Sequence, residues 1–245
     1  MKALQKMIIV EFKLFLRQPL AAFFTLVFPL FLLFLFGSIY GNEPSELLGG
    51  RGNVDVSVPG YIAMIIATAG LTNLPVVLAT YREQGILRRY QASPLKNSTL
   101  LLAQLIVTAL TVLVGGALLV ATAVLIYDLT LPVSLWGTLL TFVLGSLSFL
   151  ALGLLLAGVL GTSRTTMAVG MALHFPMIFL SGAGLPRQIL PENIQRFGDW
   201  LPLTHVVNLI QDMWFGGDWN GTALLVVTAL MFVSAFVATR TFRWE

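Results

Sequence analysis

The sequence predicts an all-α membrane protein in which six transmembrane helices follow an N-terminal interfacial helix. Of the 245 residues, 57% are hydrophobic and 10% are charged, less than half of the roughly 25% charged residues typical of soluble proteins. Long apolar runs follow one another, and the cations lie scattered at the ends of these runs. The formal net charge of +3 therefore reflects membrane topology, and no dense basic face indicates a nucleic-acid partner.

Residues 1–18 are predicted to form the interfacial amphipathic helix. At about 100° per residue, Lys2, Lys6, Lys13 and Arg17 share a sector of about 60°, while the apolar side chains point elsewhere. We expect this helix to lie in the membrane surface with its cations toward anionic headgroups. The alternative is that the segment is the solvated start of the first span. No small-residue cleavage signal follows it, so we expect no cleaved targeting peptide.

Six apolar runs are long enough to cross a hydrocarbon core of about 30 Å at about 1.5 Å per residue. These spans are predicted at residues 20–40, 59–80, 98–127, 134–160, 165–181 and 222–239. The third exceeds what the bilayer requires, so it is expected to tilt or to project into the cytoplasm. Between the last two spans, residues 186–216 contain two semi-polar amphipathic segments divided by Pro202, and these are predicted to be re-entrant or interfacial helices on the extracellular side.

Small side chains recur at four-residue spacing along the fourth span. They are Gly137, Thr141 and Gly145, and then Gly153, Ala157 and Gly161. This spacing produces a groove on one helix face, where a second helix can approach closely. The face can pack against a neighbouring span of the same subunit or support dimerisation.

The positive charges are distributed asymmetrically about these spans. If residues 1–19, 81–97, 161–164 and 240–245 share one compartment, that side holds eleven of the 14 Lys and Arg residues. The other side holds eight of the 11 acidic residues. The positive-inside rule therefore places both termini, and the segment between spans two and three, in the cytoplasm.

No enzymatic motif can be assembled from this sequence. The chain has no cysteine, and its two histidines, His174 and His205, are too distant in sequence to suggest a local metal site. Lys96 is the only lysine after position 13, and no Gly-rich loop precedes it, which excludes a P-loop. The spans contain no Asp, Glu, Lys or Arg, which argues against an ion-coupled carrier and against an intramembrane enzyme. We expect no cofactor bound by this chain.

Residues 81–94 form a compact charged insert between two long apolar runs. A short helix is predicted at 82–93, with Glu83 and Gln84 near its N-terminal end, Arg88 and Arg89 further along, and Ile86, Leu87 and Tyr90 as an apolar anchor. Such a helix can fit a groove of a soluble partner and transmit the partner's motion to the spans at either end. Because the chain carries no energy source of its own, that partner can supply the energy. The alternative is a plain cytoplasmic turn that is positive for topology.

The insert reads Arg-Glu-x-Gly-x-Leu-x-Arg-x-x-Ala-Ser-Pro from Arg82 to Pro94. It resembles the cytoplasmic coupling segment of type-2 ABC exporter permeases, where Glu-x-x-Gly-Thr-Leu-x-x-Leu-x-x-Thr/Ser-Pro is typical. Ile86 stands where Thr is common, and Tyr90 stands where Leu is common. A second match, at 175–182, 190–194 and 200–207, is similar to the family's fifth span, its re-entrant helices and the descent into the sixth span. The sequence resembles in particular the small daunorubicin-resistance-type permeases, with polysaccharide and nodulation-factor export permeases as relatives.

This resemblance implies a homodimer of six-span subunits in a bacterial or archaeal cytoplasmic (inner) membrane. Each subunit would dock on a separate ABC ATPase subunit, present in two copies, that binds ATP and Mg²⁺. The implied coupling residues are Arg82, Glu83, Gly85, Leu87, Arg88, Arg89 and Tyr90. The complex would export an amphipathic substrate, such as a drug, antibiotic, lipid or lipid-linked glycan, by alternating access. The alternative function is a membrane scaffold or immunity protein that recruits a soluble partner without transport.

The resemblance also implies a substrate path lined by the second and fifth spans. Polar and aromatic residues of these spans are the candidate contacts: Thr68, Thr72, Asn73, His174 and Phe175. The polar residues could instead make helix-to-helix hydrogen bonds within one subunit. For His174, a buried and hydrogen-bonded neutral imidazole is the alternative to contact with substrate, and Pro176 favours a kink beside it.

Overall fold

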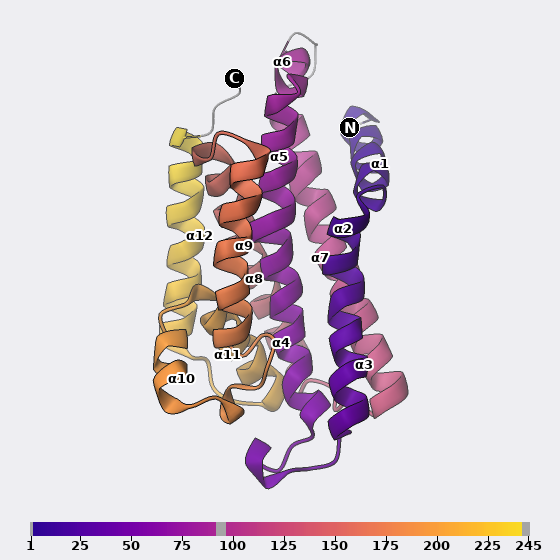
Figure 1. Ribbon diagram of the computed structural model, residues 1–245, viewed down its shortest axis with the longest axis vertical. Coiled ribbons are helices and arrows are strands. Elements are labelled where there is room, and N and C mark those ends of the chain that lie inside the picture. The colour runs from indigo at the N-terminus through magenta and orange to yellow at the C-terminus, as the bar shows by residue number, and fades with distance from the viewer. Residues whose placement is uncertain (1, 92–96, 242–245) are drawn as a thin grey trace.

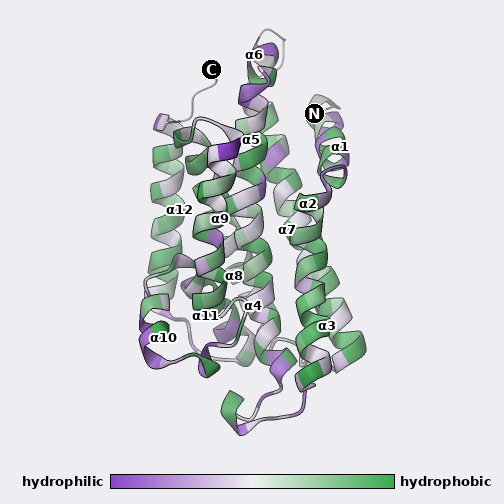
Figure 2. Cartoon of the chain, viewed as in Figure 1, coloured by the Kyte–Doolittle hydropathy of each residue, from purple (hydrophilic) through white to green (hydrophobic). Residues whose placement is uncertain are grey.

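The computed structural model describes residues 2–91 and 97–241, and in this part of the chain the regular elements are helices. Most of them run along the long axis of the molecule (Figure 1). Apolar residues cover the middle of the bundle (Figure 2). Polar residues gather at the upper end near α6 (Ile86–Gln91) and at the lower end near α10 (Glu192–Gly198). The predicted all-α class is therefore confirmed.

Five helical stretches are long and apolar enough to cross a membrane. They are Pro19–Tyr40 (α2 Pro19–Ala22, η1 Phe23–Val27, α3 Phe28–Tyr40), Asn53–Glu83 (α4 Asn53–Thr68, η3 Ala69–Asn73, α5 Leu74–Glu83), Thr99–Tyr127 within α7 (Asn97–Tyr127), Leu135–Val159 (α8) and Gly221–Thr241 (α12). The fifth predicted span, at residues 165–181, falls in α9 (Ser163–Leu180), which is not among the five. Arg164 and His174 lower the mean hydropathy of this 18-residue helix.

The continuous helix α4–η3–α5 is the centre of the bundle. Most of α4 is buried, and the helix contacts α7, α8, α9 and α11 (Pro202–Phe215). Glycines allow these contacts, because a Cβ on Gly153 of α8 would collide with the Gly70 carbonyl, and a Cβ on Gly170 of α9 with the Leu71 carbonyl. The small-residue face of α8 therefore packs against a neighbouring helix of the same chain. This is the first of the two uses that the sequence allowed, the other being dimerisation.

The second span was predicted to begin at residue 59, but α4 begins at Asn53 and Pro59 lies inside the helix, so the loop after the first span is shorter than expected. Asp55 stabilises this start: its carboxylate lies in the first turn, where a negative charge complements the helix dipole. It accepts hydrogen bonds from the backbone N–H and the hydroxyl of Thr130 at 2.9 and 3.2 Å. The Asn42 Oδ1 atom accepts the Asp55 backbone N–H at 3.0 Å. These contacts join the start of α4 to two separate loops, so the local sequence did not reveal them.

Two π-helical segments interrupt the first two membrane helices. η1 is followed by Pro29 and η3 by Pro75, and a proline lacks the N–H that an α-helix would donate four residues back. The two segments meet, because Asn73 Nδ2 donates to Thr25 Oγ1 at 2.6 Å. The prolines thus locate a pair of irregular turns, and one side-chain hydrogen bond joins them.

Helix α1 (Lys2–Leu16) stands beside the upper part of α7 (Figure 1). Met7 of α1 packs in a small apolar cluster with Tyr81, Leu87, Leu100 and Ala103, which ties α1 to α5, α6 and α7. The Lys6, Lys13 and Arg17 side chains are exposed, as expected for the basic stripe. One face of α1 is therefore covered by the bundle and the basic face is free.

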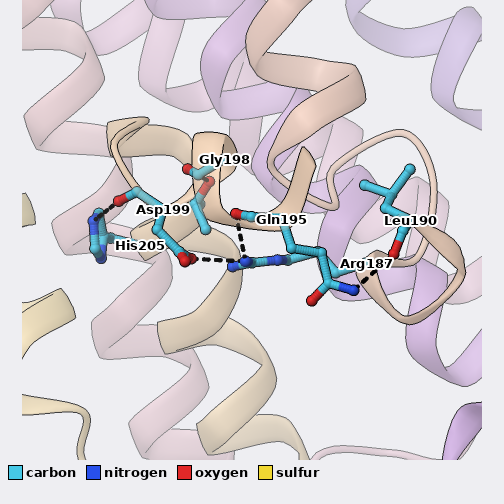
Figure 3. A network of polar contacts seen from close by, with 7 residues as sticks. Arg187, Leu190, Gln195, Gly198, Asp199 and His205 are labelled. Carbon is cyan, nitrogen blue, oxygen red and sulfur yellow. Dashed lines mark hydrogen bonds and ion pairs between the residues drawn. The ribbon is translucent and has the colours of Figure 1, made fainter. Parts of the chain in front are cut away.

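The lower end is closed by η4 (Arg187–Ile189), α10 and α11. Arg187 holds their connections together, since its guanidinium pairs with Asp199 at 2.7 Å and donates to the Gln195 carbonyl at 3.0 Å (Figure 3). The His205 ring lies 3.0 Å from the Asp199 carbonyl. Helix α11 buries one face, including Val206 and Ile210, against α4 and α8.

Candidate functional site

A largely apolar cavity of about 580 Å³ opens between the first membrane helix, the central helix and α9. Its walls include Leu20, Phe24 and Phe28 on one side and Met167, Met171 and Ile178 on the other. Arg17 and Gln18 lie at its upper boundary, where α1 turns into α2. A chamber of this size and lining suits the apolar body of a small molecule.

All five substrate-path candidates from the sequence line this cavity: Thr68, Thr72, Asn73, His174 and Phe175. They come from two helices, α4–η3 and α9, that are far apart in sequence. The structure therefore brings these residues together at one site. Their contact with substrate remains a prediction.

The threonine hydroxyls of this wall donate hydrogen bonds to carbonyl groups of their own helix. The Thr68 hydroxyl donates to the Met64 carbonyl at 2.8 Å, and the Thr72 hydroxyl donates to the Thr68 carbonyl at 2.6 Å. His174 Nε2 lies 3.3 Å from Thr68 Oγ1. Because the single hydroxyl hydrogen of Thr68 goes to Met64, Nε2 of His174 carries the hydrogen in this contact. His174 Nδ1 is then a buried acceptor, and in the described part of the chain it has no hydrogen-bond partner.

A second polar cluster surrounds Glu11 of α1, whose side chain is 5% exposed. The Tyr81 hydroxyl donates to Glu11 Oε2 at 2.6 Å, and Gln104 Nε2 of α7 donates to the same oxygen. Burial raises the pKa of the Glu11 carboxyl above its ordinary value, although these two hydrogen bonds act in the opposite direction. The cluster connects α1 to both the central helix and α7.

Glu11 is a functional candidate that the sequence reasoning missed, although a signal was present. At about 100° per residue it falls roughly opposite the basic stripe, among the apolar side chains of α1. A lone carboxylate on an apolar face requires buried hydrogen-bond donors. Tyr81 and Gln104 provide them, from positions that are 70 and 93 residues away in the chain.

The predicted coupling residue Arg82 lies at the end of α5 and reaches the C-terminal end of α8. Its guanidinium donates to the carbonyls of Ala157 at 3.0 Å and Gly161 at 3.1 Å, and also to the Leu160 carbonyl. The last carbonyls of a helix have no partner within it and carry partial negative charge. Arg82 therefore caps another helix of the same chain.

The short helix of the insert begins later than predicted. Glu83 is the last residue of α5, and Gly85 has a φ of 66°, so a turn separates it from α6 (Ile86–Gln91). A left-handed residue of this kind ends a helix and favours glycine. The Glu83 carboxylate accepts the Ser163 hydroxyl at 2.5 Å, so it contacts the start of α9 and does not lie at the N-terminus of the short helix.

The predicted apolar anchor of the insert points partly inward. Leu87 is 1% exposed and packs within the chain against α1, α5 and α7. Arg88 and Arg89 are exposed at the upper end of the molecule. The Tyr90 side chain, and the expected helix end at Ser93 and Pro94, lie outside the described residues. The exposed part of α6 is therefore basic, and Leu87 anchors it to the bundle.

The described residues contain no group of three or more His, Cys, Asp or Glu side chains placed to hold a metal ion. The candidate site consists of the large apolar cavity, its wall of polar residues and the buried Glu11 carboxylate near its upper boundary.

Comparison with known proteins points to one family. The family profile described as "ABC-2 type transporter" matches residues 2–215. The chain is 23% identical over 238 residues to the putative transport permease YvfS of Bacillus subtilis (strain 168), covering 95% of each chain. It is 25% identical over 190 residues to the probable multidrug ABC transporter permease YbhR of Escherichia coli (strain K12), covering 75% of this chain and 51% of the relative. It is 26% identical over 191 residues to nodulation protein J of Neorhizobium galegae, covering 76% and 71%.

Proposed function

Because this chain belongs to the ABC-2 type transporter family, we propose that it exports an amphipathic substrate across the cytoplasmic membrane by alternating access. It is the permease subunit, a multi-pass membrane protein that is not itself an ATPase, and the family implies an ATPase partner. The relative named as a probable multidrug permease supports a drug-like cargo; a lipid or lipid-linked glycan is equally amphipathic.

The observation that carries this proposal is the cavity between the first membrane helix, the central helix and α9. Its volume of about 580 Å³ and its mainly apolar lining suit the body of such a molecule, and Thr68, Thr72 and His174 provide a limited polar wall. Exposed aromatic side chains, such as Phe24 and Phe175, border the cavity and would face lipid. Substrate could therefore enter sideways from the bilayer.

The proposed topology has six spans, with α9 as the fifth in chain order. Its support is geometric, since α9 runs along the long axis beside α5 and η3, and the end of α12 returns to the same end as α1 (Figure 1). In this arrangement α1 is interfacial, α10 and α11 are the extracellular re-entrant helices, and both termini are cytoplasmic. The asymmetric distribution of the cations supports this orientation.

Force would enter at the end of α5 and at α6. Arg88 and Arg89 present a basic surface on which the ATPase would dock. Leu87 would transmit the resulting displacement of α6 to α1 and α7, against which it packs. Arg82 and Glu83 would pass the same displacement to α8 and α9 through their contacts with the Leu160 carbonyl and Ser163. Two such subunits and two ATPase subunits would form the complex.

The first test reconstitutes the permease with its ATPase partner in vesicles and compares Glu83→Ala and Arg89→Ala with the unaltered chain. We expect both variants to insert normally and to lower transport-linked ATP hydrolysis severalfold. Unchanged hydrolysis in both would contradict the coupling role. If the unaltered complex shows neither substrate-stimulated hydrolysis nor flux, the scaffold function is favoured instead.

The second test fills the cavity. Met171→Trp adds a large side chain to the cavity wall and is expected to lower amphiphile flux at least about tenfold, since the substrate body and the indole would need the same space. Leu125→Trp adds the same bulk to a residue of α7 that is 82% exposed, and its flux should match the unaltered protein. Equal flux in both variants would show that substrate does not use the cavity.

A further inference from the structure

A small second pocket adjoins the cavity, between α1, the central helix and α7. Its volume of about 20 Å³ holds one water-sized group. The polar residues that line it are Glu11, Gln18, Asn73, Tyr81, Gln104, Thr108 and Thr111. It shares Gln18, Asn73 and Val77 with the large cavity, so the two spaces adjoin.

Most hydrogen-bond donors around this pocket are already used within the protein. The Thr108 hydroxyl donates to the Gln104 carbonyl at 2.8 Å, and the Thr111 hydroxyl donates to the Val107 carbonyl at 2.9 Å. Gln104 Nε2 donates to Glu11 and to the Tyr81 hydroxyl. The Thr108, Thr111 and Glu11 oxygens keep lone pairs, so apart from the amide of Gln18 the pocket offers mainly acceptors. This lining favours an occupant that donates hydrogen bonds.

The charge of the lining selects the type of donor. Among the described residues that line the pocket, Glu11 is the acidic one and no lysine or arginine lies there. Burial disfavours its negative charge, and a cation within hydrogen-bond distance would offset that cost. A divalent metal usually takes several carboxylates, and the described residues offer no such cluster. A primary ammonium group has one positive charge, three donors and the size of a water molecule.

We propose that the Glu11 pocket binds the primary ammonium group of a cationic amphiphile whose apolar body occupies the adjoining cavity. This inference rests on the proposed export function and names the substrate class for it. The depth is consistent: Glu11 belongs to the helix before the first membrane span, where the amine of a membrane-dissolved amphiphile resides, and the cavity runs along that span. His174 Nδ1, on the wall of the cavity, adds an unpaired acceptor for a hydroxyl or amide of the same molecule.

The experiment uses the complex of this permease with its ATPase, reconstituted in phosphatidylcholine vesicles. Two fluorescent amphiphiles with the same apolar body are compared, one bearing a primary amine and the other a hydroxyl. We expect the unaltered complex to bind the amine tighter by about tenfold or more, because a buried charge pair is lost with the hydroxyl. Glu11→Gln should remove this preference and leave binding of the hydroxyl probe nearly unchanged.

Three further variants make the result specific. Glu11→Asp keeps the carboxylate one methylene further back and should retain part of the preference, which also controls for folding of the Gln variant. Glu46→Gln makes the same charge change at an exposed residue of the lower end and should keep the full preference. Met171→Trp should weaken both probes, because it acts on the cavity.

The outcomes separate this inference from the proposed function. If both probes bind and stimulate ATP hydrolysis equally in the unaltered complex, the ammonium site is wrong and the export function stands. If neither probe binds or stimulates, the export function itself fails. A primary ammonium can also come from a phospholipid headgroup, so the measurement is repeated with phosphatidylethanolamine. Loss of the amine preference then assigns the pocket to the lipid headgroup, and an unchanged preference assigns it to the cargo.

Discussion

At the scale of single residues, Arg82 shows how a position within a recognisable motif serves a contact that the motif does not describe. The sequence places it at the edge of a partner-docking insert, and the structure places its guanidinium on three carbonyls at the end of α8. Those carbonyls lie 75 to 79 residues away. Nothing in the local pattern could reveal the pairing, because it depends on how α5 and α8 pack.

Arg82→Ala is expected to lower the free energy of unfolding by about 1–3 kcal/mol, since it leaves partly buried carbonyls without a donor. The thermal midpoint in detergent, measured for the purified permease, should fall accordingly. Arg88→Ala removes the same charge from an exposed position of α6 and should leave the midpoint unchanged. Equal midpoints for the two variants would mean that the cap contributes no stability.

Glu11 predicts a pH dependence with a defined sign. Because burial raises its pKa in the folded protein, the protonated form favours folding, and this contribution is lost as the pH rises through the folded-state pKa. Tyr81 and Gln104 face the carboxylate, and the described lining of the pocket adds no cation. Glu11→Gln, which cannot ionise, should therefore gain thermal stability relative to the unaltered chain on going from about pH 4.5 to about pH 8. A constant difference, or one of opposite sign, would refute this assignment.

At the scale of elements, the helices were predictable and their irregularities were not. Apolar runs located the long helices, because a segment that crosses lipid must satisfy its backbone internally and remain apolar. Pro59 suggested a helix start, yet α4 begins at Asn53 because Asp55 binds Thr130 from a distant loop. Pro29 and Pro75 follow the two π-turns, but the sequence did not indicate that these turns would form or that they would join through Thr25 and Asn73.

Replacing two helical glycines by alanine should change the thermal midpoint in opposite directions. In a helix, alanine is more favourable than glycine by about 1 kcal/mol. Gly116→Ala on α7 should therefore raise the thermal midpoint, because the new methyl group would meet only the Phe142 ring, at an ordinary van der Waals distance of 3.7 Å. Gly153→Ala should lower it, because the new methyl group would collide with the Gly70 carbonyl where α8 meets the central helix. If both variants were stabilising, the close approach of these two helices would be incorrect.

At the scale of the whole molecule, the candidate site could be predicted only in outline. Thr68, Thr72, Asn73, His174 and Phe175 were chosen as polar or aromatic residues of two spans, and they line one cavity. The sequence could not show that Arg17 and the first membrane helix complete that cavity, or that Glu11 lies above it. A cavity forms where three helices do not pack tightly against one another. Hydrophobic periodicity shows which face of each helix is buried, but not how closely the helices pack.

The proposed topology can be measured directly because the chain has no cysteine. Arg88→Cys and Gly161→Cys should react with a membrane-impermeant maleimide only from the cytoplasmic side. Glu46→Cys and Glu192→Cys should react only from the opposite side, since six spans place η2 (Glu46–Leu48) and α10 there. The unaltered chain provides the unlabelled control. Reaction of Glu192→Cys from the same side as Arg88→Cys would show that α9 does not cross the membrane.

The π-turn η3 also fixes the angular phase between the two halves of the central helix. Below it lies Thr68 on the cavity wall, and above it lie Tyr81 and Arg82, whose side chains meet α1 and α8. One α-helical residue corresponds to about 100° of rotation and about 1.5 Å of rise. Deleting a single residue from 69–73 would therefore turn the Glu11 and α8 contacts away from their partners without altering either half, whereas a deletion in the loop at 41–52 would preserve the phase. The number of residues in η3 is therefore part of the transport mechanism proposed for this helix.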